Sequence, residues 1–373
     1  MKTLTLLPGF SSHRDDWAIP VQQNLARLLA TRLDLTILAL RYPHRRDRYS
    51  LDGAAVYALG AGQVRGIGRI KLWWDAILRI EKLHREQPFD LLHAMWADET
   101  GLIAAWAGRR LGIPVVVSIL GGELVGLHDI NYGLQRGSFS RWIVGQALNG
   151  ADRVIVPSEY VHRLIPAAGY AIPDEKIVKI TLGVDAHRFT PAESPADPYR
   201  LIHVASLVPV KDQTLLLRAF ALLDPRTTLD LVGTGAEQAK LEALARELGI
   251  TERVRFIGAV AHPDLPDYYR KAALHILTSR HETIALTTLE AAACGVPTIS
   301  TAVGIVPDYP ALGIAVSGRD TDGFASALQA LIDDADRRAA LGWSARQAAQ
   351  GELSIEATAD QLIRLYQALT GKL

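Results

Sequence analysis

The sequence has almost no cysteine, no net charge and no long hydrophobic run. Its 373 residues include a single cysteine, Cys294, and two methionines. One cysteine cannot form an internal disulfide, which predicts a reducing compartment. The 40 basic residues are balanced by 40 acidic ones. This balance argues against a nucleic-acid-binding protein with a globally basic surface.

Long apolar stretches are also missing. No run approaches the roughly 18 apolar residues that a membrane-spanning helix needs. The first ten residues, MKTLTLLPGF, hold one lysine and an apolar run that Pro8 and Gly9 interrupt too early for a secretory signal. We therefore expect a cytoplasmic protein that has no nucleic acid among its partners.

The chain instead alternates short aliphatic runs with longer amphipathic segments. At roughly 150 residues per domain, its length predicts two domains, each with its own core. Aliphatic runs too short for helices predict buried strands at 4–7, 35–40, 91–94, 115–120, 153–156, 201–205, 229–232, 254–257, 274–277 and 298–300. Helical patterns lie between these runs, as is typical of α/β folds in which helices cover a parallel sheet on both faces.

A proline-rich segment separates two such halves. Residues 189–199 hold three prolines in eleven positions, which predicts a linker. We therefore expect one Rossmann-like domain over residues 1–195, a second over 196–355, and a final helix over 356–373. Domains of this kind bind ligands at the carboxyl ends of their strands. The pattern suits a two-substrate enzyme and equally a two-lobed binding protein, although the latter normally carries an export signal.

The segment 279–304 carries the most informative side chains. Glu282 and Glu290 are separated by seven residues, and a helix is expected to begin near Leu286 or Thr287. The free N–H groups of such a helix end bind phosphate. Glu282 could then accept hydrogen bonds from sugar hydroxyls, and Glu290 from a ribose diol. Thr287 and Glu290 also fit a capping box, in which Glu290 would be structural.

Motifs along nearly the whole chain occur in the order found in one family. The segment resembles the donor-binding signature of family 4 retaining glycosyltransferases, E-G-F-G-L-x-x-L-E-A-M-A-C-G-x-P-V-x-x. Its glutamates match, as do Leu286, Leu289 and the run ACGVP at 293–297. Further matches are Pro8 and Gly9, LVPVK at 207–211, LVGTG at 231–235, VRFIG at 254–258 and LSIEATADQLIRLY at 353–366. The resemblance implies the GT-B fold, with two Rossmann-like domains facing a central crevice. The domain over 1–195 would be on the acceptor side, the domain over 196–355 would bind the nucleotide sugar, and the C-terminal helix over 356–373 would cross back to the N-terminal domain.

The resemblance also implies roles for single residues. Lys211 would bind the donor pyrophosphate and stabilise the charge that develops on the leaving nucleoside diphosphate; without the family it is a residue of a surface turn. Glu282 would hold the transferred sugar, and Glu290 the ribose. The remaining implied donor contacts are Gly9, Gly233, Ala259, Val260, Thr283, Ile284, Ala285, Leu286 and Thr287. Gly9 equally fits an ordinary turn at the end of a strand.

Two departures concern the donor site. Ser206 stands where the family usually has arginine, so one pyrophosphate cation is missing unless Arg14 or Arg280 replaces it. The usual Gly-Phe-Gly after the first glutamate is replaced by residues 283–285, Thr-Ile-Ala. This replacement predicts a narrower or differently shaped sugar pocket.

A third departure lies in the N-terminal half. Leu120 occupies the position of an expected histidine, and the next turn offers Gly121, Gly122 and Glu123 as sugar or acceptor contacts. Glu123 is either such a contact or a solvated loop carboxylate. His128, on the following loop, is either an acceptor contact or a plain loop residue.

Basic residues are concentrated in one segment of the N-terminal half. Residues 41–85 hold ten basic and four acidic side chains, with Trp73 and Trp74 on the predicted helix. This composition permits weak contact with an anionic membrane, which would place the protein at its inner face. The alternative is a solvated helix whose tryptophans pack inward. The acceptor itself, a lipid, a saccharide or a small molecule, is left open.

The implied reaction is the retaining transfer of a hexosyl group from UDP- or GDP-hexose to an acceptor hydroxyl, without metal or cofactor. Asp320 and Asp322 spell D-x-D, but they open a predicted helix, where capping explains them. The histidines lack zinc-site spacing. The departures leave one alternative, a nucleotide-sugar-binding protein of the same fold without transfer activity.

The balanced total charge conceals two halves of opposite sign. Residues 1–195 hold 23 basic and 19 acidic side chains, whereas residues 196–373 hold 17 and 21. An anionic acceptor or membrane surface therefore fits the first half. In the second half, local groups such as Lys211 and a helix end must hold the donor phosphates.

Overall fold

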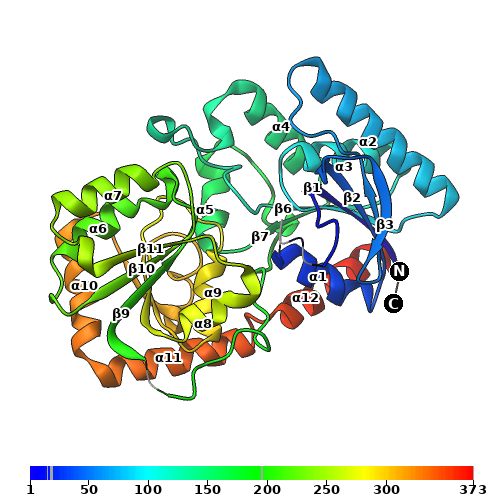
Figure 1. Cartoon of the computed structure of the whole chain (residues 1–373). Helices are drawn as coiled ribbons and strands as arrows, with labels where there is room; N and C mark the ends of the chain where they lie inside the picture. Colours follow the sequence, from blue (N-terminus) through cyan, green and yellow to red (C-terminus); the bar gives the residue numbers. More distant parts are fainter. Residues whose placement is uncertain (15, 17–19, 195, 373) are drawn as a thin grey trace. The chain divides into compact units, whose positions relative to one another are not determined.

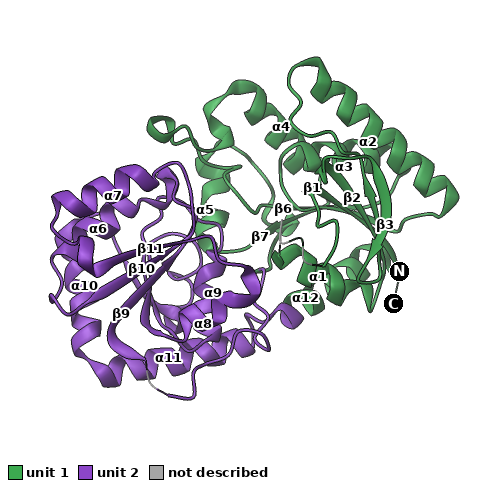
Figure 2. Ribbon diagram, viewed as in Figure 1, with its two compact units in different colours: residues 1–181, 358–373 green, residues 182–357 purple. Residues whose placement is uncertain are grey.

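Two α/β units make up the chain (Figure 1), and the computed structural model describes residues 1–14, 16, 20–194 and 196–372. One unit consists of residues 1–181 and 358–373, and the other of residues 182–357 (Figure 2). The predicted α/β class with two parallel-sheet domains is confirmed. The division falls at 181/182 and 357/358, whereas the sequence predicted 195/196 and 355/356.

Unit 1 contains an eight-stranded sheet in the order β3-β4-β2-β1-β5-β6-β7-β8 within the described residues. All neighbours pair in parallel except β3 and β4, which form an antiparallel hairpin. The strands are β1 (Lys2–Gly9), β2 (Asp34–Tyr42), β3 (Asp47–Leu51), β4 (Ala54–Ala58), β5 (Leu91–Ala94), β6 (Val115–Ser118), β7 (Arg153–Val156) and β8 (Ile177–Lys179). The helices are α1 (Pro20–Ala30), α2 (Ile67–Glu86), α3 (Glu99–Leu111), α4 (Ser138–Asn149), α5 (Glu159–Ala167) and most of α12 (Ile355–Thr370).

Unit 2 contains a six-stranded parallel sheet in the order β11-β10-β9-β12-β13-β14 within its described residues. Its strands are β9 (Asp197–Val204), β10 (Thr228–Val232), β11 (Val254–Gly258), β12 (Ala272–Leu277), β13 (Thr298–Thr301) and β14 (Gly313–Val316). Its helices are α6 (Gln213–Ala221), α7 (Gln238–Glu247), α8 (Leu265–Tyr269), α9 (Leu286–Ala293), α10 (Thr321–Asp333) and α11 (Ala335–Gln350). Two helix groups, α6 with α7 and α10, and α9 with α8 and α11, cover the sheet (Figure 1).

The central strands of each sheet supply its core. Leu4 and Leu92 in unit 1, and Leu201 and Leu274 in unit 2, are fully buried. Helices cover both faces of a parallel sheet, so its strands read as continuous aliphatic runs. This explains why these strands could be predicted from the sequence.

The proline-rich segment does not mark the division between the units. Phe189 within it is 1% exposed, and its ring packs edge-on against His262 and Tyr269. The Arg346 guanidinium donates a 2.8 Å hydrogen bond to the Phe189 carbonyl. The segment therefore belongs to unit 2, because one buried aromatic ring anchors it despite its prolines.

Helix α12 begins in unit 2 and continues onto unit 1, which confirms the predicted crossing of the C-terminal helix (Figure 2). The Tyr366 hydroxyl lies 2.6 Å from Nδ1 of His93, and Nε2 of His93 lies 2.8 Å from the Ser118 hydroxyl. Burial lowers the pKa of His93 to about 3, so the ring is neutral. These buried hydrogen bonds attach α12 to strands β5 and β6.

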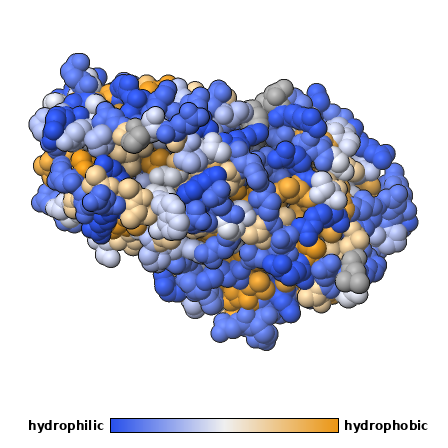
Figure 3. Space-filling model, turned by 90° about the horizontal axis from the view of Figure 1, so that it is seen from below, coloured by the Kyte–Doolittle hydropathy of each residue, from blue (hydrophilic) through white to orange (hydrophobic). Residues whose placement is uncertain are grey.

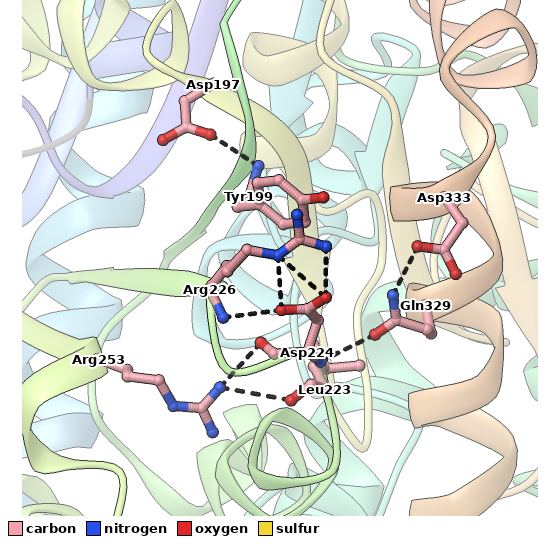
Figure 4. Close-up of polar contacts among 8 residues, drawn as sticks. All are labelled: Asp197, Tyr199, Leu223, Asp224, Arg226, Arg253, Gln329 and Asp333. Atoms are coloured by element: carbon pink, nitrogen blue, oxygen red, sulfur yellow. Dashed lines mark hydrogen bonds and ion pairs between the residues drawn. The ribbon is translucent and has the colours of Figure 1, made fainter.

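A polar network fixes the turn that leads into β10 (Figure 4). The Asp224 carboxylate accepts hydrogen bonds from the Arg226 side chain, whose guanidinium lies over the Tyr199 ring at 4.1 Å. Arg253 donates to the carbonyls of Leu223 and Asp224. The network lies at the amino-terminal ends of β9 and β10. It thus stabilises the end of the sheet opposite to the carboxyl ends of its strands.

Figure 3 shows one face of the molecule, which is mainly hydrophilic. On the face drawn in Figure 3, apolar residues form small areas between hydrophilic ones. No helix in the described ranges is long and apolar enough to cross a membrane.

Candidate functional site

The predicted donor residues gather at the carboxyl ends of the strands in unit 2. Lys211 ends a short 3₁₀ helix, Pro209–Lys211, that follows β9. Gly233 follows β10, Ala259 and Val260 follow β11, and Glu282 follows β12. The carboxyl ends of parallel strands meet at one edge of a sheet. The fold therefore places all of these residues along that edge.

Lys211 and Glu282 form an ion pair. The Lys211 ammonium donates to a carboxylate oxygen of Glu282 at 2.5 Å, and the Ser279 hydroxyl donates to the same oxygen at 2.6 Å. The Thr278 hydroxyl donates to the Lys211 carbonyl at 3.0 Å. The two side chains are 24% and 12% exposed. A cation and a carboxylate are thus held together at the rim of the sheet, a contact that the sequence did not predict.

The start of α9 offers unused backbone donors. The N–H groups of Leu286 and Thr287 make no hydrogen bond within the part of the chain that is described, whereas that of Thr288 donates to the Ala285 carbonyl. The Thr288 hydroxyl is buried, and the described residues offer it no partner. Free N–H groups and the positive end of the helix dipole make this helix start suitable for an anion.

The loop before α9 contains a backbone conformation that favours glycine, but the residue at that position is Ala285. Ala285 has a φ of 68°, in the left-handed region, and it is buried. The Ile284 carbonyl accepts a 3.3 Å hydrogen bond from Ile305, and a Cβ on Gly304 would lie 3.0 Å from the Glu282 Cβ. Gly304 therefore lets the segment after β13 approach the loop closely. Gly304 ends the informative segment 279–304, but it was not predicted as a residue of the site.

We expect Ala285→Gly to raise the free energy of unfolding by about 0.5–1 kcal/mol. The left-handed backbone costs alanine about 1–2 kcal/mol, and the greater freedom of glycine in the unfolded chain offsets part of the gain. Urea-induced unfolding of both proteins measures the difference. Lower stability of the variant would show that the Ala285 methyl group contributes more by packing than its backbone costs.

Glu290 is held by two side chains from other elements. It is 5% exposed, and its carboxylate oxygens lie 2.9 Å from Nε2 of His262 and 2.9 Å from the Tyr269 hydroxyl. Burial raises the pKa of Tyr269 well above its ordinary value, so the hydroxyl keeps its proton and donates a hydrogen bond to Glu290. The capping-box interpretation is wrong, because Ala285 precedes α9 and makes no side-chain cap.

Gly9 and Gly233, which were predicted to contact the donor, are also required by the packing around them. A Cβ on Gly233, whose φ is 131°, would lie 2.0 Å from the Ala205 carbonyl oxygen. A Cβ on Gly9 would lie 2.8 Å from the Cβ of Tyr42 on β2. Both positions need glycine for close backbone approach. Their contacts with the donor stay predictions.

Comparison with known proteins identifies the family. Residues 187–348 match the family described as glycosyl transferases group 1, and residues 19–183 match a glycosyl transferase 4-like domain. A D-inositol 3-phosphate glycosyltransferase of Thermomonospora curvata is 31% identical over 341 residues, which cover 80% of this chain and 76% of that protein. The chain belongs to the group 1, or family 4, glycosyltransferases.

Solved structures share the fold of this glycosyltransferase. Sucrose-phosphate synthase from Thermosynechococcus elongatus superimposes with a TM-score of 0.80 at 24% identity, over 100% of both chains. Anabaena HepE, solved in complex with UDP and glucose, gives 0.77 at 20% identity, over 99% of this chain and 100% of that one. The likeness establishes the GT-B fold.

The two candidates to replace the missing arginine of the glycosyltransferase family lie in different units. Arg14 is in unit 1 and pairs with Asp52 at 2.8 Å. Arg280 is in unit 2, where its N–H donates to the Val210 carbonyl at 2.8 Å. Arg280 is thus attached to the turn that carries Lys211.

The predicted sugar or acceptor contacts in unit 1 of this glycosyltransferase lie near the buried carboxylate of Glu123. Glu123 is 1% exposed and accepts hydrogen bonds from the N–H groups of Ala97 (3.3 Å), Leu120 (3.1 Å) and Gly121 (2.6 Å). The solvated-carboxylate interpretation is therefore wrong, because Glu123 stabilises the turn from within. A contact of Glu123 with substrate stays a prediction.

The other unit 1 candidates are loop residues. A Cβ on Gly121 would lie 3.2 Å from the Glu123 carboxylate, and one on Gly122 would lie 3.0 Å from the Tyr132 ring. His128 is exposed at the start of a short 3₁₀ helix, His128–Ile130. Its contact with an acceptor stays a prediction.

The buried Glu123 predicts a pH dependence of stability. Burial raises its pKa to about 7, from about 4.3 in an unfolded chain. The contribution to stability is therefore complete below about pH 4.3 and is lost as the pH rises through 7. Between pH 5 and 8 we expect the free energy of unfolding of wild type to fall by about 1–3 kcal/mol relative to that of Glu123→Gln. Urea unfolding at each pH measures this difference. Parallel pH profiles would contradict this assignment.

The D-x-D sequence of the glycosyltransferase caps a helix, as predicted. Asp320 precedes α10, and its carboxylate accepts a 2.7 Å hydrogen bond from the Gly323 N–H. Within the described ranges, no group of three or more His, Cys, Asp or Glu residues is placed to hold a metal ion.

The basic segment 41–85 contributes two arginines to an ionic cluster that was not predicted from the sequence. Glu99, at the start of α3, pairs with Arg41 and with Arg69 (2.6 Å), and it accepts a 2.9 Å hydrogen bond from the Trp73 indole. Burial would raise the pKa of Glu99, but its hydrogen bonds from Arg69, Arg41 and Trp73 outweigh burial and lower it. Trp73 is buried, whereas Trp74 is 47% exposed. The expectation that both tryptophans pack inward is therefore wrong.

Proposed function

We propose that this glycosyltransferase transfers a hexosyl group from UDP- or GDP-hexose to an acceptor hydroxyl, with retention at the anomeric carbon and without a metal ion or cofactor. The main support is the Lys211–Glu282 pair together with the unused N–H groups of α9, a helix that begins four residues after Glu282 along the chain. A cation and a helix start suit the two phosphates of a donor, and a carboxylate suits sugar hydroxyls.

In the proposed step, the bond between the anomeric carbon and the donor phosphate oxygen breaks. The acceptor oxygen bonds to the same carbon on the same face, and its proton passes to the leaving phosphate oxygen. Lys211 and the N–H groups of Leu286 and Thr287 stabilise the negative charge that develops on that leaving group. Glu282 positions the sugar.

Glu290 is the proposed ribose ligand. Its two hydrogen bonds, from His262 and Tyr269, fix the orientation of the carboxylate before a donor arrives. A carboxylate oxygen has two lone pairs, so each oxygen can still accept a bond from a ribose hydroxyl. Backbone groups of Ala259 and Val260 are the proposed contacts of the base.

The comparisons guide the choice of substrates. HepE is solved with UDP and with UDP-glucose, which makes UDP-glucose the first donor to test. The curated relatives are named for D-inositol 3-phosphate. An anionic polyol acceptor of this kind fits the excess of basic residues in the first half of the chain, and saccharides and lipids remain to be tested beside it.

Release of nucleoside diphosphate tests the function. The protein is incubated with UDP- and GDP-hexoses, with and without D-inositol 3-phosphate or a simple saccharide, in the presence of EDTA. We expect one of the donors to release nucleoside diphosphate, and the release to increase when an acceptor is added. The anomeric configuration of the product, determined by NMR, should match that of the donor. Donor binding without any release would instead favour a nucleotide-sugar-binding protein without transfer activity.

We expect Glu282→Gln to separate sugar use from nucleotide binding. The substitution removes the carboxylate that holds Lys211, so the ammonium becomes freer to bind the free nucleoside diphosphate. Affinity for the diphosphate should stay equal or increase, while kcat/KM for the donor falls about tenfold or more. Calorimetry and initial rates measure the two quantities. Equal losses of both would indicate that Glu282 is structural.

A further inference from the structure

Gln213 is a glutamine that is buried at the first position of α6. Its side chain is 1% exposed, although glutamine is a residue type that mostly lies at protein surfaces. An amide that is buried without hydrogen bonds destabilises the fold, so a buried glutamine needs partners. Gln213 follows Lys211 by two residues, but its burial keeps it from touching a bound donor. A role at the site must therefore act through the turn that carries Lys211.

The Gln213 amide joins strand β9 to the turn that follows it. The side-chain nitrogen of Gln213 lies 3.2 Å from Nε2 of His203 and 3.0 Å from the Ser206 carbonyl oxygen. His203 is itself fully buried on β9, and its Nδ1 lies 2.8 Å from the carbonyl oxygen of Ile276 on β12. The two side chains thus connect two neighbouring strands of the sheet with the turn after β9.

The direction of each hydrogen bond in this network follows from its chemistry. A carbonyl oxygen can only accept, so Nδ1 of His203 carries the ring proton that bonds to Ile276. Burial lowers the pKa of His203 to about 4, so at neutral pH the ring is uncharged and Nε2 is an acceptor. The Gln213 amide therefore donates one hydrogen to His203 and the other to the Ser206 carbonyl. A side chain without two donors on one atom cannot make both bonds.

The hydrogen bond from Gln213 to Ser206 fixes the turn from which Lys211 extends. It links the two ends of the segment 206–213. Inside the segment, the Lys211 N–H donates to the Val208 carbonyl at 2.9 Å, so the turn is a closed, hydrogen-bonded unit. A shift of the Ser206 carbonyl would therefore move the backbone that carries the Lys211 ammonium.

The network lies close to the Lys211–Glu282 pair. Beside the effect of burial, the two charges act on the His203 ring in opposite directions, Lys211 lowering its pKa and Glu282 raising it. Charges act on a neighbouring group in this way only over short distances. The buried network therefore adjoins the pair, whereas its own side chains are covered and form no part of the surface that meets a donor.

We propose that Gln213 is a positioning residue of the transfer reaction, which holds the turn so that the Lys211 ammonium meets the donor phosphates. The inference rests on the proposed function, because it takes the binding of the donor by Lys211 as given. A lysine side chain is long and flexible, so the position of its backbone decides which part of the site the ammonium reaches. A misplacement of about 1 Å lowers rates by up to about 100-fold, so the loss of the bond to Ser206 should be visible in the kinetics.

A double-mutant cycle tests the proposal on the full-length protein. Gln213→Met keeps the length of the side chain but removes both donors, and we expect it to lower kcat/KM for the active donor about tenfold. In the Lys211→Ala background the same substitution should cause no further loss, because the group that Gln213 positions is absent. If the two losses multiply instead, Gln213 does not act through Lys211, and the proposal is overturned.

The single variants separate this inference from the proposed function. If Lys211→Ala has normal kinetics, the assignment of Lys211 to the donor fails, and the role of Gln213 fails with it. If Lys211→Ala loses activity but folded Gln213→Met does not, only the positioning role is wrong.

Gln329→Met provides the matched control. Gln329 on α10 accepts a 3.0 Å hydrogen bond from the Asp224 N–H at the opposite end of the sheet (Figure 4). Both substitutions remove a glutamine that bonds to the backbone of unit 2, so both should lower stability, but only Gln213→Met should lower the rate. Equal losses of rate in the two variants, measured well below their unfolding temperatures, contradict the proposal.

Gln213→Glu keeps the proposal testable if the methionine variant does not fold. The introduced carboxyl group has nearly the shape of the amide, and it can share one proton with Nε2 of His203. Whichever group holds that proton, it lies between the two, so none is left for the Ser206 carbonyl. We expect a loss of about tenfold that again disappears in the Lys211→Ala background. Full activity of Gln213→Glu overturns the proposal.

Discussion

Lys211→Ala is expected to lower kcat/KM about 100-fold or more. With Ser206 at the position of the family arginine, Lys211 is the side-chain cation that the Pro209–Lys211 turn brings to the carboxyl ends of the strands. Groups that stabilise developing charge on a leaving group typically contribute this much when removed singly. Lys211→Arg keeps the charge but changes its geometry, so we expect partial activity. Initial rates with the active donor measure all three proteins.

The control for this prediction is a lysine without a role at the site. Lys240→Ala removes an exposed ammonium on α7 that pairs with Glu237, and it should leave the rates unchanged. Lys211→Ala also leaves Glu282 without its cation, so thermal unfolding must show that the variant is folded at the assay temperature. Near-normal kinetics of a folded Lys211→Ala protein would assign the charge to another group, with Arg280 on the adjoining segment as the first candidate.

The parallel strands could be predicted because a strand that is buried on both faces has apolar side chains at nearly every position. β5 and β6 are short, fully buried aliphatic runs. Helix α9 begins at Leu286, where the sequence predicted its start.

The hairpin of β3 and β4 was missed, although its signal is present. Asp52 and Gly53 both have positive φ, as a tight hairpin turn requires. The Asp-Gly turn and the alternation around it are the usual sequence signal of a hairpin. The observed burial of β3 alternates with exposure, as expected for an edge strand.

The site was predicted as a set of residues but not as a set of contacts. Spacing and resemblance selected Lys211, Glu282 and Glu290, yet nothing in the order of the motifs pairs the first two. His262 and Tyr269 lie 28 and 21 residues from Glu290 along the chain, and their contact with it depends on how α8 and α9 pack. Glu123 shows the same limit, because a glutamate in a glycine-rich turn gives no sign in the sequence that it is buried.

Glu99→Ala is expected to lower the free energy of unfolding by about 3–5 kcal/mol. Glu99 is 7% exposed and holds two arginines, Arg41 and Arg69, that are themselves largely covered. Removing one partner of a buried ionic cluster leaves the remaining charges uncompensated, which costs far more than the cluster contributes net. Urea unfolding at neutral pH measures the loss.

A surface ion pair from the same region provides the control, and pH provides a second test. Glu81→Ala breaks the exposed pair with Arg110 and should cost less than about 1 kcal/mol. Because the pKa of Glu99 is lowered in the folded state, its contribution is present above the unfolded value of about 4.3 and is lost as the pH falls through the lower folded value. The stability gap between wild type and Glu99→Gln should therefore narrow on acidification below about pH 4. If Glu99→Ala costs no more than Glu81→Ala, or if the gap widens in acid, the arginines are solvated well enough to do without Glu99.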